Sequence, residues 1–274
     1  MKNIFLLLLV NMLLLSCNSN AQQQQLQDKL PVHDSLKIDS KILNETRIIN
    51  IWTPPNYATS TDSLPVLYMP DGGLQEDFPH IANTVAELVN NKTIRPVIVV
   101  GIENIQRRKD LSGPTEIEED KKIAPVIGGA EKFRSFINDE LFSEINKRYR
   151  TTTEKGIIGE SLAGLFIVET FFIAPDMFDF YIAMDPSLWW NNHYLIRTAK
   201  DNLAKFPTNQ KRLWFAGSKT KDISVYTKEF SKILATQQLK NLSWKFSDEP
   251  KEKHNTIYRA TKEKALIWSL SPSK

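Results

Sequence analysis

Two kinds of segment alternate along this chain. Short continuous apolar runs, such as Pro65–Met69 and Pro96–Ile102, are typical of strands buried on both faces of a parallel sheet. Between such runs, apolar residues recur at helical spacing, for example in segments 81–89 and 133–145. Strands that alternate with helices predict a mostly parallel central sheet with helices on both faces.

The pattern predicts the following elements. Strands are expected at 36–42, 47–52, 65–69, 96–102, a short stretch around 157–158, 178–184, 212–216 and 242–246. Helices are expected near 81–89 and at 130–149, 162–173, 194–206, 223–239 and 257–270, with a long polar loop at 103–129. Because ligands of such folds bind at the carboxyl ends of the strands, the polar residues there are the candidates for function.

The N-terminus has the composition of an export signal. Lys2 precedes an apolar run from Ile4 to Leu15, which is too short for a stable membrane span. Leu14-Leu15-Ser16-Cys17 resembles a bacterial lipobox, in which Cys17 is lipidated, whereas cleavage after Ala21 is the alternative. We expect residues 1–21 to be a lipoprotein signal region, 22–35 a polar tether and 36–274 one catalytic domain, exported to the bacterial periplasm or outer membrane.

Charge and cysteine content narrow the possible functions. The formal net charge of the 274 residues is +3, and no dense basic run suggests a nucleic-acid partner. The only cysteine is Cys17, so the mature chain is expected to have no disulfide and no thiol nucleophile. No His/Cys/Asp cluster has metal-ligand spacing, no glycine-rich phosphate loop occurs, and we expect neither a metal nor a cofactor. Contact with the membrane is expected only through the lipid anchor.

One segment carries candidate chemistry. Gly159-Glu160-Ser161-Leu162-Ala163-Gly164 follows a short apolar strand and opens a helix, as the nucleophile elbow of α/β-hydrolases does. Such a turn holds the serine in a strained backbone conformation and tolerates only small residues nearby. The usual pattern is G-x-S-x-G, and this chain has Ala163 at the last position, with Gly164 next.

Several segments, in this order and spacing, resemble the putative esterase family of α/β-hydrolases. They read P-V-L-Y-M-P-D-G-G, V-I-V-V-G-I-E-N, G-E-S-L-A-G-L-F and D-P-S-L-W-W, and the resemblance covers about residues 46–256. It is strongest to the siderophore-esterase-like branch; the family also includes feruloyl esterases, esterase D and mycolyltransferases. A second departure from the pattern is Asp185, where a serine is commoner. The resemblance implies the α/β-hydrolase fold and a serine hydrolase.

A serine hydroxyl needs a base, and the chain has four histidines. The order Ser…acid…His of α/β-hydrolases selects His254, in the loop after the last strand. The acid is expected in the loop after strand 212–216, where Asp222 is the only carboxylate; Asp248 or Glu249 could substitute for it. Some siderophore-esterase relatives are expected to work with little help from an acid.

Further residues are predicted to surround the serine. The oxyanion hole is expected to use the backbone N–H of Leu162 and a second one from Gly72 or Gly73. Of Trp189 and Trp190, we expect one in the core and one on the pocket wall. Arg107 and Arg108 either bind an anionic or catechol-bearing substrate or pair with carboxylates such as Asp110.

These residues predict an exported serine esterase that acts on a small-molecule ester. A siderophore-type lactone and a carbohydrate or aryl ester both remain possible substrates. The alternatives are an acyltransferase on the same fold and a catalytically silent binding lipoprotein.

Overall fold

The computed structural model describes residues 28–272, so the predicted signal region and Cys17 lie outside the described residues. Its centre is one eight-stranded sheet with the order β1-β2-β4-β3-β5-β6-β7-β8. The strands are β1 (Asp34–Ser40), β2 (Glu45–Trp52), β3 (Leu64–Met69), β4 (Ile98–Ile102), β5 (Thr151–Glu160), β6 (Phe180–Met184), β7 (Lys211–Ser218) and β8 (Leu242–Glu249). The β1–β2 and β2–β4 pairs are antiparallel, and all the other pairs are parallel.

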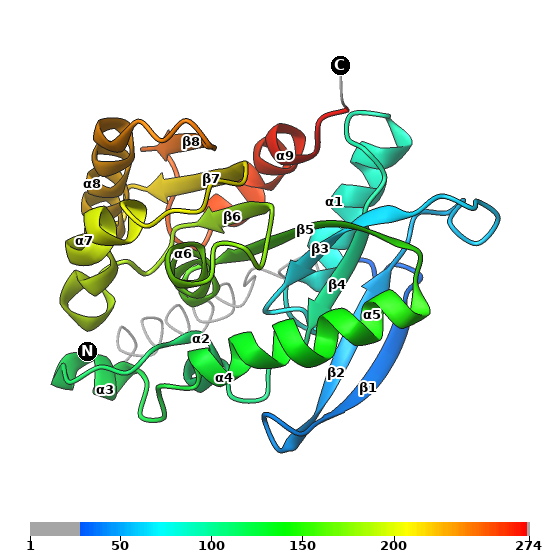
Figure 1. The fold of residues 1–274 in the computed structure, drawn as a ribbon, viewed down its shortest axis with the longest axis horizontal. Helices are drawn as coiled ribbons and strands as arrows, with labels where there is room; N and C mark the ends of the chain where they lie inside the picture. Colours follow the sequence, from blue (N-terminus) through cyan, green and yellow to red (C-terminus); the bar gives the residue numbers. More distant parts are fainter. Residues whose placement is uncertain (1–27, 273–274) are drawn as a thin grey trace, which may run out of the picture.

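Helices cover both faces of this sheet (Figure 1). They are α1 (Phe78–Asn90), α2 (Arg107–Leu111), α3 (Glu118–Ile123), α4 (Ala130–Ser135), the π-helical turn η1 (Phe136–Leu141), α5 (Phe142–Arg148), α6 (Leu162–Ile173), α7 (Trp190–Leu203), α8 (Lys221–Gln237) and α9 (Ile257–Leu270). The mostly parallel sheet between two helical layers confirms the predicted architecture. Among residues 28–272, no helix has the length and apolarity needed to cross a membrane.

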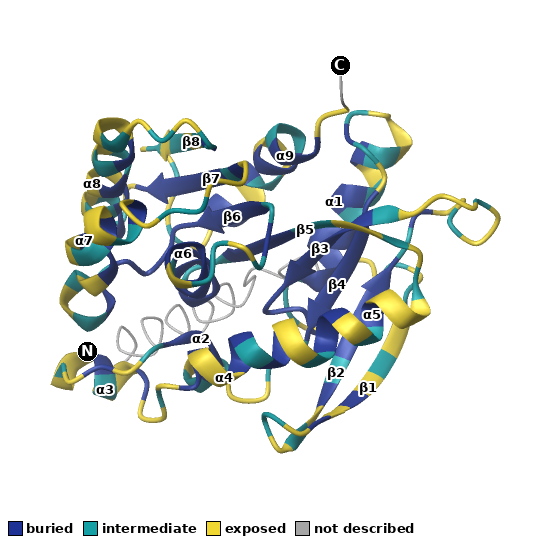
Figure 2. Cartoon of the chain, viewed as in Figure 1, coloured by how far each residue is buried: buried dark blue, intermediate teal, exposed yellow. Residues whose placement is uncertain are grey.

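Alternate side chains of each central strand enter two separate cores. On β3, Val66 and Tyr68 belong to the core beneath α4, α5, α6, α7 and α8, whereas Leu67 and Met69 belong to the core beneath α1 and α9. Because both faces are covered, these strands are apolar at nearly every position, as the continuous apolar runs of the sequence predict. Figure 2 shows the central strands buried and the edge strand β1 partly exposed.

Three predicted elements differ from the structure. The 103–129 segment is not a continuous loop, because it contains the short helices α2 and α3. β5 begins at Thr151, which pairs with Leu64, rather than as a short stretch. Its first three residues are threonines that lie outside the core and break the apolar pattern. α7 is assigned from Trp190, but residues 191–193 have positive φ, so its regular part begins close to the predicted residue 194.

Candidate active site

The predicted nucleophile elbow is present between β5 and α6. Ser161 has φ 60° and ψ −116°, a conformation that only glycine adopts without strain. A Cβ on Gly159 would lie 2.7 Å from the Cβ of Ala163, and a Cβ on Gly164 would lie 3.0 Å from the Cα of Pro186. The space above Gly159 therefore accommodates the methyl group of Ala163, and this explains why alanine fits at the last position of the pattern.

Three side chains form a hydrogen-bonded chain at this elbow. His254 Nε2 lies 3.0 Å from Ser161 Oγ, and His254 Nδ1 lies 3.0 Å from Asp185 Oδ2. The hydrogen bond to Asp185 raises the pKa of His254 above its usual value, against the opposing effect of burial. With the proton on Nδ1 donated to Asp185, Nε2 is free to accept the serine proton, which is the arrangement of a serine-hydrolase triad.

The structure corrects the predicted acid. Asp222 is exposed in the first turn of α8, where a negative charge interacts favourably with the helix dipole. Asp248 pairs with Lys228, and Glu249 pairs with Lys264. The carboxylate at His254 is instead that of Asp185, which follows β6.

Asp185 is held where a triad acid is needed. It is completely buried, it has φ 44°, and its Oδ1 accepts a 2.5 Å hydrogen bond from the backbone N–H of Ser218 at the end of β7. Both Asp185 and Asp222 lie between the serine and the histidine in chain order, so the order could not separate them. The signal that could have done so was the departure from the family pattern, an aspartate where serine is commoner.

The predicted oxyanion-hole donors lie at the start of α6 and in the turn after β3. Leu162 is the first residue of α6, where a backbone N–H has no partner within the helix. The prediction for Gly72 is wrong, because its N–H donates to the Ile102 carbonyl at 2.9 Å. A Cβ on Gly72 would lie 2.2 Å from Ile102 N, so glycine lets this turn approach β4 rather than a substrate. The N–H of the alternative, Gly73, also has a partner, because it donates to Glu76 Oε2 at 2.7 Å.

A cleft of about 410 Å³ opens over Ser161 and His254. Its lining residues are Ile123, Ser161, Ser187, Trp189, Thr220, Asp222, Ile223 and His254. As predicted for the tryptophan pair, Trp189 is on the wall and Trp190 is in the core, 5% exposed. Among residues 28–272, no group of three or more His, Cys, Asp or Glu side chains could hold a metal ion.

Arg107, Arg108 and Asp110 have other contacts than the sequence predicted. Arg107 binds Asp71 through two hydrogen bonds of 2.6 and 2.7 Å, and it acts electrostatically on His254. Arg108 is exposed and is not among the residues that line the cleft, so the structure does not support it as a pocket residue. Asp110 pairs with the buried Arg47, rather than with either neighbouring arginine.

Comparison with known proteins identifies the family. The model of the family described as "Putative esterase" matches residues 40–271. The chain belongs to this esterase family. It is 29% identical over 175 residues to the ferri-bacillibactin esterase BesA of Bacillus subtilis, a match that covers 56% of this chain and 58% of BesA. It is 34% identical over 98 residues to a siderophore triacetylfusarinine C esterase of Aspergillus fumigatus, covering 35% of this chain and 32% of the relative.

Solved structures agree with this assignment. An IroE-like serine hydrolase from Shewanella oneidensis superposes with a TM-score of 0.80 at 25% identity, covering 87% of this esterase-family chain and 80% of the neighbour. The BES protein from Bacillus cereus gives 0.78 at 23% identity, covering 89% and 100%, and supports the fold alone. The predicted α/β-hydrolase fold is thereby confirmed, and the curated relatives support the predicted siderophore-esterase-like branch. The matched stretches span less than two thirds of BesA and of the fungal esterase.

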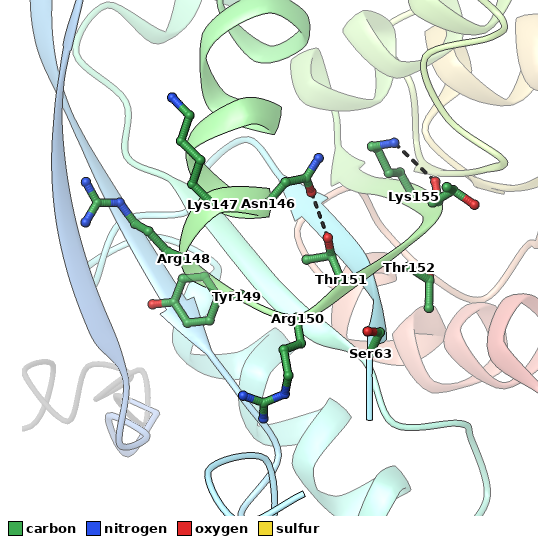
Figure 3. Close-up of a pocket in the computed structure, with 10 residues that line it drawn as sticks. Ser63, Asn146, Lys147, Arg148, Tyr149, Arg150, Thr151, Thr152 and Lys155 are labelled. Atoms are coloured by element: carbon green, nitrogen blue, oxygen red, sulfur yellow. Dashed lines mark hydrogen bonds between the residues drawn. The ribbon is translucent and has the colours of Figure 1, made fainter. Parts of the chain in front are cut away.

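This esterase-family protein also has a larger hollow, of about 590 Å³, far from the triad. Figure 3 shows its lining side chains, which surround the start of β5 and the end of α5. Lys147, Arg148 and Arg150 contribute positive charge there, and Asn146 accepts a hydrogen bond from Thr151. It contains no histidine and lies at the amino end of β5, so it is not the site of the serine chemistry.

Proposed function

We propose that this protein is a serine esterase that hydrolyses a siderophore-type ester through an acyl-enzyme on Ser161. The observation that carries the proposal is the hydrogen-bonded chain Ser161–His254–Asp185 at a strained elbow. The two relatives described above are named a ferri-bacillibactin esterase and a siderophore triacetylfusarinine C esterase, and these names support the substrate class.

The proposed reaction uses the three hydrogen-bonded side chains in turn. Ser161 Oγ attacks the ester carbonyl carbon while His254 Nε2 takes its proton. Buried Asp185 stabilises the imidazolium, and the N–H groups of Leu162 and Gly73 receive the oxyanion once Glu76 releases Gly73. His254 then gives the proton to the leaving alcohol. A water molecule, deprotonated by His254, releases the acid and restores the serine hydroxyl.

A fluorophosphonate probe tests this proposal. We expect the probe to label the wild-type protein at Ser161, identified by peptide mass spectrometry, and to leave Ser161→Ala unlabelled. Hydrolysis of ferric and iron-free siderophore lactones, followed by chromatography of the products, tests the substrate class. Ester products formed on addition of acceptor alcohols would indicate the acyltransferase instead. Absence of labelling in folded wild-type protein would leave only a binding function.

We also propose that the protein is an exported lipoprotein anchored at Cys17. The support is Lys2, the apolar run and the lipobox-like Leu14-Leu15-Ser16-Cys17. In cells, Cys17→Ser is expected to leave the precursor uncleaved or to move the protein out of the membrane fraction. Unchanged processing and membrane association would favour cleavage after Ala21.

A further inference from the structure

A second carboxylate lies beside the triad and has no role in the reaction described so far. Glu160 is the last residue of β5 and immediately precedes Ser161. Its Oε1 is buried and has no hydrogen-bond partner among the described residues. When one carboxylate oxygen is withdrawn from water without a partner, the charged form becomes less favourable, and groups perturbed in this way concentrate at functional sites.

The charged groups around Glu160 come from four other parts of the fold. His254 follows β8, Asp77 precedes α1, Asp185 follows β6, and Arg107 is in α2. Burial is the main reason that the pKa of Glu160 is raised to about 8. Asp77 and Asp185 raise it further, while His254, the strongest of the charged neighbours, and Arg107 lower it.

The interaction between Glu160 and His254 is reciprocal. After the hydrogen bond to Asp185 and the effect of burial, the charge of Glu160 is the next influence on the imidazole. It favours the imidazolium, the form that His254 takes while the tetrahedral intermediate exists. The buried hydroxyl of Tyr258, in α9, lacks a hydrogen-bond partner among the described residues and also senses the charges of Glu160, Asp77 and Asp71.

We infer that Glu160 is a positioning residue that acts through His254. Glu160 is a second carboxylate beside the triad, and its ionisation increases the rate of attack by Ser161. The inference rests on the proposed serine-esterase function. When Glu160 is protonated it is neutral and gives the imidazolium no Coulombic support. When it loses its proton to solvent, its negative charge stabilises the imidazolium that forms in the transition state. Asp185 is the constant partner of His254, and Glu160 is the pH-dependent one.

This predicts a rate profile with two steps. As pH rises, kcat/KM first increases as His254 loses its proton in the free enzyme. It then increases again, by about three- to tenfold, as Glu160 ionises. A merely structural carboxyl group would give no second step, because only the charge and not the packing changes over that range.

The experiment measures rates of an aryl acetate and of fluorophosphonate labelling between pH 5 and 9.5. We expect the second step in the wild type, its loss in Glu160→Gln, and its return with an altered midpoint in Glu160→Asp. Glu249→Gln is the matched control, because that carboxylate is bound by Lys264 and Ser247, and should keep both steps. Circular dichroism and thermal unfolding verify that each variant is folded.

A measurement on the wild type makes the test independent of the variants. The ring resonances of His254, followed by NMR in the intact protein, are expected to show a second inflection near the pKa of Glu160. A single inflection, or a wild-type rate profile that Glu160→Gln does not change, would overturn this inference while leaving the esterase intact. Failure of the probe to label the wild type at any pH would instead reject the proposed function itself.

Discussion

The charged side chains at the two ends of β5 differ in their burial and in their partners. At the carboxyl end, Ser161 has a strained backbone and Asp185 is fully buried against a backbone N–H. At the amino end, where Figure 3 shows the side chains of Lys147 and Arg148, both residues are exposed, and they share one carboxylate, that of Glu144.

The hollow at the amino end is the larger one, about 590 Å³ against about 410 Å³, yet the reactive groups are at the other end. Exposed ion pairs are weak because water and salt screen them, whereas a desolvated, oriented carboxylate acts strongly on a neighbouring imidazole. Fixed charge withdrawn from water therefore distinguishes the candidate active site, and the volume of a hollow does not.

Removal of the nucleophile should give the largest difference between the two ends. Ser161→Ala is expected to lower turnover of p-nitrophenyl acetate by at least about 10³-fold, since the attacking oxygen is lost. Thr152→Ala, which removes an exposed hydroxyl at the amino end, is the control and should keep normal turnover. Retention of more than a tenth of the activity by a pure Ser161→Ala preparation would exclude this serine as nucleophile.

Replacement of the triad acid should lower kcat strongly at Asp185 and only slightly at Asp222. In Asp185→Asn the amide is expected to keep its acceptor toward Ser218 and to present its NH₂ group to His254 Nδ1. The imidazole then carries its proton on Nε2, and kcat should fall by roughly 10²- to 10⁴-fold. Asp222→Asn should change kcat by less than about threefold, because an exposed carboxylate contributes little. Equal losses in the two variants would contradict the assignment of the acid.

The pH midpoint at which activity is lost on acidification should depend on Asp185. Ester attack requires neutral His254, whose pKa is raised above its usual value chiefly by the hydrogen bond to Asp185. Activity of the wild type should therefore fall as pH decreases, with a midpoint above the usual pKa of a histidine. In Asp185→Asn, where this cause is absent, the midpoint of the residual activity should be lower. Stopped-flow rates from pH 5 to 8 measure both midpoints, and a common midpoint would show that Asp185 does not control the base.

Strain at the elbow should appear as a gain in stability when it is relieved. Ser161→Gly is expected to be about 1 kcal/mol more stable than Ser161→Ala, because glycine adopts φ 60° and ψ −116° without a Cβ clash. Urea unfolding of the two inactive variants isolates the backbone effect from the loss of the hydroxyl group. If alanine is as stable as glycine there, the elbow is not strained.

The cationic hollow should give the smallest effect. Lys147→Ala and Arg148→Ala are each expected to change the free energy of unfolding by less than about 0.5 kcal/mol, since both are exposed partners of Glu144. Esterase activity should be unchanged. A tenfold loss of activity in either variant would show that the two ends of β5 are coupled.

Much of the fold was determined by the sequence itself. The continuous apolar runs of the central strands require burial on both faces, and the helical spacing between them supplies the two covering layers. The elbow could also be predicted from the sequence, because its steric requirement for small residues around Ser161 is met by Gly159 and Gly164, all within six residues of chain. His254 followed because its place after the last strand is set by chain order.

Only the tertiary structure decided which partners these groups have. Asp185 and Asp222 both satisfy the order Ser…acid…His, but the position of β6 beside β5, together with the N–H of Ser218 on β7, buries Asp185 at the imidazole. The sequence allows the N–H of Gly72 to bind a substrate. In the structure its turn lies so close to β4 that this N–H donates to the carbonyl of Ile102 instead. Local pattern determines where a strand ends and which residues follow it. The partner of each hydrogen-bonding group depends on contacts between segments far apart in the chain, and these exist only once the sheet has assembled.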